Sequence, residues 1–181
     1  MSSALLTREV VERAVRLLRP MVEEEFIKNE KGRCVAAICV FDPTVEYFRP
    51  DLAPIANGNP SLPILWEGLI GETDTSKWPV GRDYRVFARL KATIAWKTRK
   101  ATHLIQRNQP HLYSTGDFKY GGGTFFEDIP IGTSGLKWQK DLATSNSLGS
   151  LLHAFCLESF ENQLSDNENY FVVGQETEMI A

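Results

Sequence analysis

The run from Val35 to Phe41, Val-Ala-Ala-Ile-Cys-Val-Phe, contains no polar residue and has the length of a strand. A strand with one exposed face alternates polar and apolar residues, so this run predicts a central strand that is covered on both faces. The turn Asp42-Pro43-Thr44 follows it, and Val45–Phe48 alternates well enough to form a short partner strand. The sequence therefore predicts a hairpin in the middle of a sheet.

Three segments have the apolar spacing of amphipathic helices. The first is predicted from Thr7 to about Asn29, and Pro20 should kink it or divide it in two. The longest is predicted from Asp83 to about Asn108 and carries a basic face. A last helix, opened by Asp141, places five apolar side chains on its inner face: Leu148, Leu151, Leu152, Phe155 and Phe160.

Proline- and glycine-rich sequence separates these helices. Five of the nine prolines lie in Pro50–Gly81, which has no clear periodicity and suggests a lid, a flap or an insertion. Short strands are predicted over Leu112–Ser114 and Thr124–Ile131, with a tight turn over Gly132–Gly135. Tyr170–Val173 is predicted to be a final strand or an arm that packs on a neighbour.

Length and composition predict one globular domain. The chain has 181 residues and a formal net charge of -3, which argues against a dedicated nucleic-acid-binding protein. Between Arg82 and Arg107 there are eight basic residues and one acid, whereas the segment from Glu158 onward has six acids and no Lys or Arg. We expect a single domain over 1–160, with an insertion at about 50–81, and an acidic tail over 161–181.

The N-terminus lacks the apolar core of a signal peptide, and no segment has the ~20 apolar residues of a membrane span. The three cysteines show no zinc-site spacing, and Cys34 and Cys39 should point to opposite faces of one strand. A reduced cytoplasmic location without membrane attachment is the expectation from these features.

The basic helix and the glycine run that follows it suggest an anion-binding site. Arg99 and Lys100 can pair with carboxylates or phosphates, and Gly121–Gly123 can expose backbone N–H groups. An exposed helix face and a plain turn are the simpler explanations of the same residues. Four further candidates for ligand contacts lie nearby: His103, His111, Tyr120 and Phe125. The histidines lack the paired spacing of a zinc site, and no catalytic triad is visible.

A group of short motifs resembles the GlcG/HbpS-like haem-binding family. These are Ala88–Ala92 or Arg99-Lys100-Ala101 in the long helix, Gly121-Gly122-Gly123, Ile129-Pro130-Ile131, Ser134-Gly135-Leu136, and Asp141 at the start of the last helix. The resemblance covers about Val10 to Phe160. It implies an α+β, profilin-like fold in which helices flank a central antiparallel sheet, and it implies self-association through helices or sheet edges.

The resemblance also implies a small-molecule-binding protein whose ligand is haem or another anionic, partly apolar molecule. In that case Arg99 and Lys100 would bind carboxylates, and His103 or His111 would be the axial ligand of haem iron. The long 50–81 segment and a short glycine-to-Ser134 spacing reshape the expected pocket. These two differences favour an alternative, a cofactor-independent isomerase, cyclase or lyase of secondary metabolism on the same fold.

Overall fold

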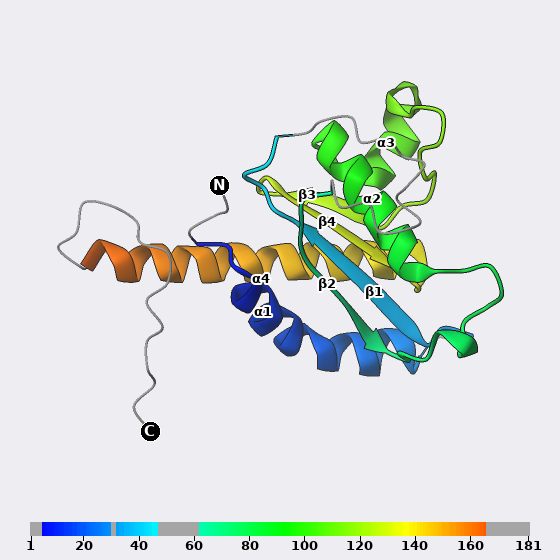
Figure 1. Cartoon of the computed structure of the whole chain (residues 1–181), viewed down its shortest axis with the longest axis horizontal. Coiled ribbons are helices and arrows are strands. Elements are labelled where there is room, and N and C mark those ends of the chain that lie inside the picture. The colour runs from blue at the N-terminus through cyan, green and yellow to red at the C-terminus, as the bar shows by residue number, and fades with distance from the viewer. Residues whose placement is uncertain (1–4, 30–31, 47–61, 166–181) are drawn as a thin grey trace.

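The protein is a mixed α/β domain built on one four-stranded antiparallel sheet (Figure 1). The computed structural model describes residues 5–29, 32–46 and 62–165. Its strands are β1 (Val35–Phe41), β2 (Ile64–Gly71), β3 (Gly123–Phe126) and β4 (Ile129–Ser134), in the order β2-β1-β4-β3. The predicted fold class, an α+β domain with a central antiparallel sheet, is confirmed.

Strand β1 is central, as its composition predicts, and all seven of its residues are buried. It pairs with β2 on one side and with β4 on the other. Its side chains alternate between two apolar clusters. Ala36, Ile38 and Val40 join the cluster under α1 and α4, and the odd-numbered residues join the cluster under α2. The apolar run therefore reflects a strand with a separate core on each face.

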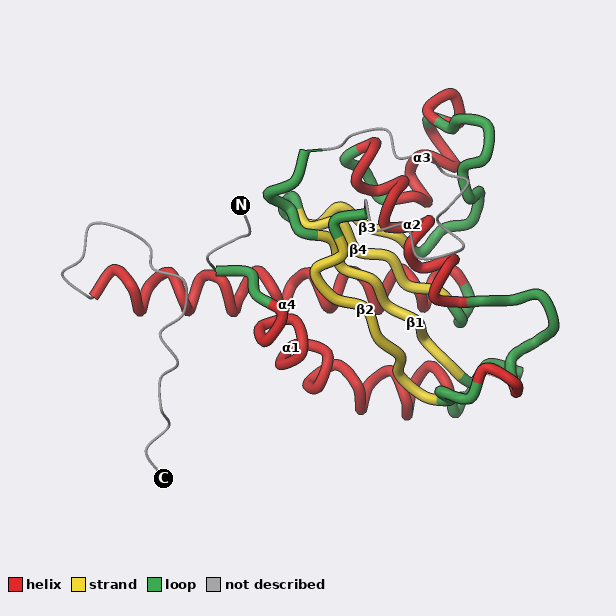
Figure 2. The backbone as a smooth tube through the Cα atoms, in the orientation of Figure 1, coloured by secondary structure: helices red, strands yellow, loops and turns green. Residues whose placement is uncertain are grey.

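Helices cover both faces of the sheet (Figure 2). One face packs on α2 (Tyr84–Thr98). The other packs on α1 (Arg8–Met21), which continues as a π-helical turn over Val22–Ile27, and on α4 (Trp138–Ser165). Pro20 lies inside α1, so the helix accommodates the proline where a kink or a division was predicted.

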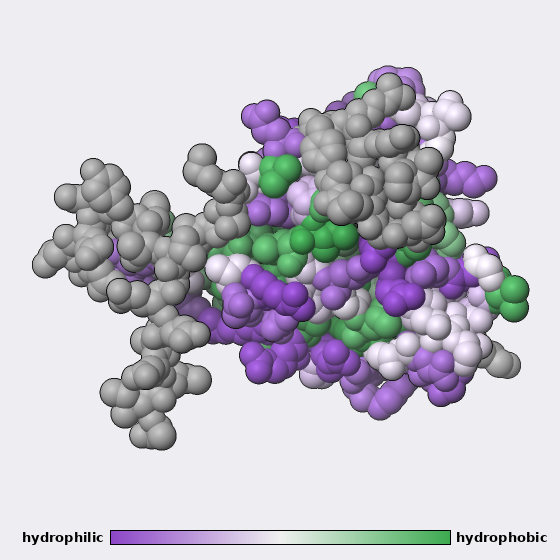
Figure 3. Space-filling model, in the orientation of Figure 1, coloured by the Kyte–Doolittle hydropathy of each residue, from purple (hydrophilic) through white to green (hydrophobic). Residues whose placement is uncertain are grey.

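The partner of β1 is not the segment that the sequence suggested. Val45 and Glu46 do not form a strand, and Tyr47 and Phe48 lie outside the described residues. The partner is β2, which comes from the 50–81 stretch where no regular element was predicted. Pairing of β2 with β1 is a long-range contact, and the prolines and glycines around β2 hide it from local sequence patterns. In Figure 3 apolar side chains gather along this partly buried edge strand.

The long helix predicted over 83–108 is two helices, and the prediction of one helix is wrong. Arg99 adopts the left-handed conformation (φ 52°, ψ 37°) and ends α2. The chain then turns into α3 (Thr102–Asn108). Thr102 is the first residue of α3, and its Oγ1 atom accepts a hydrogen bond from the Gly123 N–H and donates one to the Gly123 carbonyl. This contact ties α3 to β3.

The predicted strand at 112–114 is also wrong, since a 3₁₀ turn spans Pro110–Leu112 and the chain then runs irregularly toward β3. A second 3₁₀ turn spans Thr75–Lys77. The single strand predicted over 124–131 is the hairpin of β3 and β4, and it turns at Glu127 and Asp128, both with positive φ. The turn predicted at 132–135 lies mostly within β4. Gly132 is needed for packing, because a Cβ there would lie 2.0 Å from the Ala88 carbonyl oxygen of α2.

The last helix is confirmed, and its buried residues Leu148 and Leu152 face the sheet. Figure 1 shows that α4 extends well beyond the sheet at its C-terminal end. The segment predicted as a final strand or arm, 170–173, lies outside the described residues. Among the helices of the described ranges, none has an apolar stretch long enough to cross a membrane.

Candidate functional site

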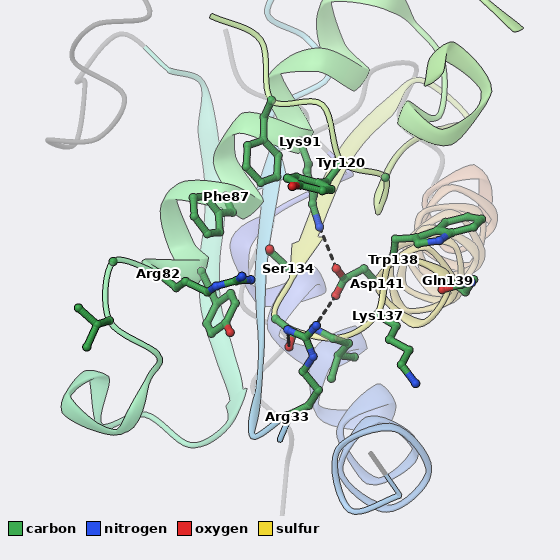
Figure 4. Close-up of a pocket in the computed structure, with 17 residues that line it drawn as sticks. Arg33, Arg82, Phe87, Lys91, Tyr120, Ser134, Lys137, Trp138, Gln139 and Asp141 are labelled. Carbon is green, nitrogen blue, oxygen red and sulfur yellow. Dashed lines mark hydrogen bonds and ion pairs between the residues drawn. The ribbon is translucent and has the colours of Figure 1, made fainter. Parts of the chain in front are cut away.

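A cavity of about 690 Å³ opens between the N-terminal half of α2 and the start of α4 (Figure 4). The loop before α2 and the loop before β3 form its sides, and the end of β4 forms its floor. The residues that line it are Arg33, Val80, Gly81, Arg82, Tyr84, Phe87, Lys91, Phe118, Tyr120, Gly121, Ser134, Gly135, Leu136, Lys137, Trp138, Gln139 and Asp141.

Aromatic rings form one wall of the cavity. Phe87 of α2 stacks on Phe118, with ring centroids 4.8 Å apart and an angle of 18° between the planes. The Phe118 ring contacts Tyr120 at 5.2 Å, and Trp138 lines the cavity from α4. Rings held against one another lose little conformational entropy when a ligand binds, so this wall suits a flat, apolar molecular body.

The lining is strongly cationic. Four of its side chains are basic, Arg33, Arg82, Lys91 and Lys137, and one is acidic, Asp141. The Arg33 guanidinium approaches the Gly135 carbonyl at 3.5 Å, which places it beside the turn that leads into α4. An anionic group would therefore find a positive potential and arginine donors beside the aromatic wall.

Lys91 and Asp141 form a buried ion pair in the cavity wall. The Lys91 Nζ donates to Asp141 Oδ2 at 2.8 Å and to the Thr133 carbonyl at 2.8 Å. The other carboxylate oxygen, Oδ1, accepts the Leu136 N–H at 3.0 Å, which fixes the turn before α4. Each side chain is only 3% exposed. Charges so well removed from water are tolerated because each is hydrogen-bonded.

Burial shifts both groups toward their neutral forms. Desolvation raises the pKa of Asp141 to about 6, and this effect exceeds the opposing attraction of Lys91. Desolvation likewise lowers the pKa of Lys91, against the opposing charge of Asp141. A cavity carboxyl group that titrates near neutral pH is suited to proton transfer as well as to structural pairing.

The glycine run makes room for this ion pair. Gly122 has φ +115°, and a Cβ there would lie 2.9 Å from Lys91 Nζ and 2.6 Å from Asp141 Cβ. The Gly123 N–H donates to Thr102, so it does not point at a ligand. Of the three glycines, Gly121 lines the cavity. Close packing explains Gly122 and Gly123, where the sequence suggested exposed N–H groups.

The predicted site residues divide into two groups. Tyr120 and Gly121 line the cavity, whereas the other seven predicted residues do not. Arg99 and Lys100 lie at the break after α2, where the Lys100 ammonium donates to Gln109. Arg99 and Lys100 were expected to bind an anion together with the glycine run, but other basic residues line the cavity in their place. Phe125 lies in β3 opposite Pro130.

Neither predicted histidine lines the cavity, although His103 lies behind its wall. The His103 ring stacks on Trp138 with centroids 6.2 Å apart. Its Nδ1 atom is buried and has no hydrogen-bond partner among the described residues, and burial lowers its pKa. His111 lies in the 3₁₀ turn after α3. Within the described ranges, no group of three or more His, Cys, Asp or Glu residues could hold a metal ion.

Sequence reasoning missed Arg33, Lys91 and Trp138 as cavity residues. A signal existed for Lys91, because it lies four residues from both Phe87 and Ala95 and so interrupts an apolar helix face with a charge. Asp141 was named only as part of the family resemblance. No local pattern marks Arg33, which reaches the site because β1 and β4 are paired.

No protein-family model matches the sequence, and no curated protein matches it. The structure is similar to the crystal structure of Klebsiella pneumoniae protein ORFY, which is described as DUF336, with a TM-score of 0.51 and 17% sequence identity. The match covers 82% of this chain and 90% of that protein. DUF336 is the GlcG-like family, so the likeness supports a GlcG-like fold and, at this identity, concerns the fold alone.

Proposed function

We propose that the protein binds a small organic anion with a flat, apolar body in the cavity between α2 and α4. The single observation that carries this proposal is the lining itself, in which a stacked aromatic wall faces basic side chains. The aromatic rings would contact the body of the ligand. Arg82, Arg33 and Lys137 would contact its carboxylate or a similar anionic group.

A pair of probes of equal shape tests this proposal. Isothermal titration calorimetry would compare 4-isopropylbenzoate, which has a ring and a carboxylate, with the neutral 4-isopropylbenzamide. We expect the carboxylate to bind about tenfold or more tightly, since each tenfold corresponds to about 1.4 kcal/mol and charge-assisted hydrogen bonds supply that much. Equal binding of the two probes, or binding of neither, contradicts the proposal.

Site variants locate the binding. Arg82→Gln and Lys137→Gln remove lining charges, so each should weaken carboxylate binding and leave amide binding nearly unchanged. Arg99→Gln is the matched control, because Arg99 is a basic residue of the same part of the chain that does not line the cavity. If Arg99→Gln weakens binding as much as Arg82→Gln does, the ligand binds where the sequence first suggested.

Haem is a narrower proposal for the same site. The basic lining residues suit its propionates, but the described residues that line the cavity include no His, Cys or Met. The imidazole ligation expected of His103 or His111 therefore has no support in the lining, and we favour an organic anion without iron. Titration with haem is a separate arm of the test. A shift of the Soret band that disappears in His103→Ala would support haem as the ligand.

A second candidate function is proton-transfer catalysis, the first step of many isomerase, cyclase and lyase reactions. The observation in its favour is the Asp141 carboxyl group, which lines the cavity with its pKa raised to about 6 by burial. Asp141 would accept a proton from a carbon next to a carbonyl group, and the electrons of the broken C–H bond would form an enolate. Asp141 would then return the same proton to another atom of the enolate.

Solvent exchange tests this second function. In D₂O the acetyl methyl group of 4-acetylbenzoate would exchange hydrogen for deuterium, followed by ¹H NMR. We expect exchange above the protein-free rate with the wild type and the protein-free rate with Asp141→Asn. Exchange at the protein-free rate in both would leave the protein with a binding role. Self-association, which the sequence resemblance implies, is a further proposal that sedimentation analysis can test.

A further inference from the structure

The cavity wall holds one ammonium N–H donor, on Lys91, that no described residue accepts. An ammonium group has three N–H donors. Those of Lys91 make two hydrogen bonds to described residues, to the Thr133 carbonyl and to Asp141. The side chain is 3% exposed, and what remains exposed borders the cavity. Because Lys91 lines the cavity, we expect its third N–H to face the cavity.

Ser134 adds a second donor at the same place. It is the last residue of β4 and is 4% exposed. Its register partner on β1 is Ala37, which belongs to the cluster under α2, so the Ser134 side chain lies on the face that carries Lys91. The Ser134 hydroxyl makes no hydrogen bond to another described residue. Figure 4 shows the Lys91 ammonium between the Ser134 hydroxyl and the Asp141 carboxylate, with a dashed line that joins it to Asp141.

We propose that Lys91 and Ser134 together bind one carbonyl or enolate oxygen of the ligand. This inference rests on the proposed function and refines it, because it names the ligand class as flat carboxylic acids that carry a ketone or aldehyde away from the carboxylate. The lining cations Arg82 and Lys137 take the carboxylate, and the buried pair of donors takes the carbonyl oxygen. Asp141 holds Lys91 in place through its Oδ2 atom.

A carbonyl oxygen benefits from this floor more than an apolar group of the same shape does. Lys91 and Ser134 are only 3% and 4% exposed, and a buried donor without an acceptor is unfavourable. A ligand that brings a carbonyl oxygen supplies the missing acceptor. An isopropyl group at the same place displaces water and supplies none, so it should bind less tightly.

The test compares 4-acetylbenzoate with 4-isopropylbenzoate, which differ by a carbonyl oxygen in place of a methyl group. With the wild type we expect 4-acetylbenzoate to bind about tenfold more tightly, the size of one hydrogen bond to a charged group. The double variant Lys91→Met/Asp141→Asn removes the ammonium without leaving a lone buried charge. It should abolish the preference, measured as the ratio of the two dissociation constants.

Ser134→Ala is the second variant, and it decides the matter if the double variant does not fold. We expect it to reduce the preference about threefold and to leave binding of 4-isopropylbenzoate unchanged. A wild type that binds both benzoates equally overturns this inference and leaves the proposed function standing, as does a preference that is undiminished in Ser134→Ala. A wild type that binds neither benzoate overturns both.

Discussion

Gly122 lies against Asp141 so closely that a Cβ at Gly122 would be 2.6 Å from the Asp141 Cβ. The same atom would be 2.9 Å from both Lys91 Nζ and the Thr133 carbonyl oxygen. The Gly122 carbonyl in turn accepts hydrogen bonds from the Ser145 hydroxyl and the Thr133 N–H. The conformation of the glycine run and the geometry of the buried ion pair are therefore interdependent.

We expect Gly122→Ala to lower the free energy of unfolding by about 2–4 kcal/mol, because it combines overpacking with strain at a positive φ. Urea denaturation would measure the change. Gly32→Ala is the matched control, since Gly32 has φ +79° and no atom within 4 Å of its Cβ position. Equal losses in the two variants would show that backbone strain alone accounts for the effect and that Gly122 is not packed on the ion pair.

The two halves of the ion pair should respond differently to substitution. Lys91→Met leaves the Asp141 carboxylate buried without its cation, so we expect a loss of about 3–5 kcal/mol of stability at pH 7. Asp141→Asn should cost less, because asparagine keeps an acceptor for the Leu136 N–H and the buried Lys91, whose pKa is lowered by desolvation, can lose its proton. The double variant should regain most of the loss of Lys91→Met, as denaturation of all four proteins would show.

An exposed pair provides the reference for this cycle. Arg8 and Glu12 form an ion pair on α1 with exposed fractions of 66% and 50%. Water and salt screen such a pair, so its coupling energy should stay below about 0.5 kcal/mol. A coupling between Lys91 and Asp141 as small as this would contradict the structural role of the buried pair.

Stability should depend on pH through Asp141. The pKa of Asp141 is about 6 in the folded protein and near 3.8 in the unfolded chain. Between pH 3.8 and pH 6 the folded state therefore binds more protons than the unfolded state. Stability therefore decreases as the pH rises through this window. We expect the wild type to lose roughly 1–3 kcal/mol relative to Asp141→Asn between pH 4 and pH 7, because one pKa unit corresponds to about 1.4 kcal/mol. Titrating groups that do not contact Asp141 are common to both proteins and cancel in the difference, whereas Lys91 loses in Asp141→Asn the charge that raises its pKa, so the comparison reports the pair.

Urea titrations at pH 4, 5, 6 and 7 on both proteins would measure this difference. The trend would be the reverse if the folded pKa of Asp141 were below that of the unfolded chain, as it would be if the attraction of Lys91 exceeded the desolvation of the carboxyl group. A flat difference across the range would mean that burial does not shift the pKa of Asp141.

Trp138 should report ligand binding by its fluorescence. It lines the cavity and is 38% exposed, so a bound aromatic acid would displace water from its ring. We expect titration with 4-isopropylbenzoate to change the tryptophan emission, and Trp138→Phe to remove most of that change. Trp66→Phe is the control, because Trp66 packs on the other face of the sheet. A signal that disappears in Trp66→Phe and survives in Trp138→Phe would place the ligand elsewhere.

The β3–β4 turn offers a stabilising substitution. Glu127 and Asp128 have φ of 43° and 65°, the positive values that a two-residue hairpin turn requires. Asn-Gly adopts these values with less backbone strain than Glu-Asp does. We expect Glu127→Asn/Asp128→Gly to raise the free energy of unfolding by about 1 kcal/mol, measured in urea. Thr44→Asn is a control at a turn outside the hairpin and should have little effect. A destabilised double variant would argue against the hairpin register.

Several elements were predictable because their signals are local. The apolar run of β1 identified a strand covered on both faces, and the spacing of α1 and α4 identified two helices. The β3–β4 hairpin was missed because Glu127-Asp128 lacks the glycine or asparagine that marks such a turn. The break at Arg99 was missed because the left-handed residue that ends a helix is usually glycine or asparagine, and here it is an arginine.

The sequence by itself determined the spacing of apolar residues, and with it the α+β class and the burial of the central strand on both faces. It also singled out Tyr120 and Gly121, which line the cavity. Only the tertiary structure decided which cations and which acid meet. Lys91 and Asp141 are 50 residues apart, and they form a pair because α2 and α4 pack on the same sheet. Burial then sets their charges, and burial is a property of the whole fold that no local pattern encodes.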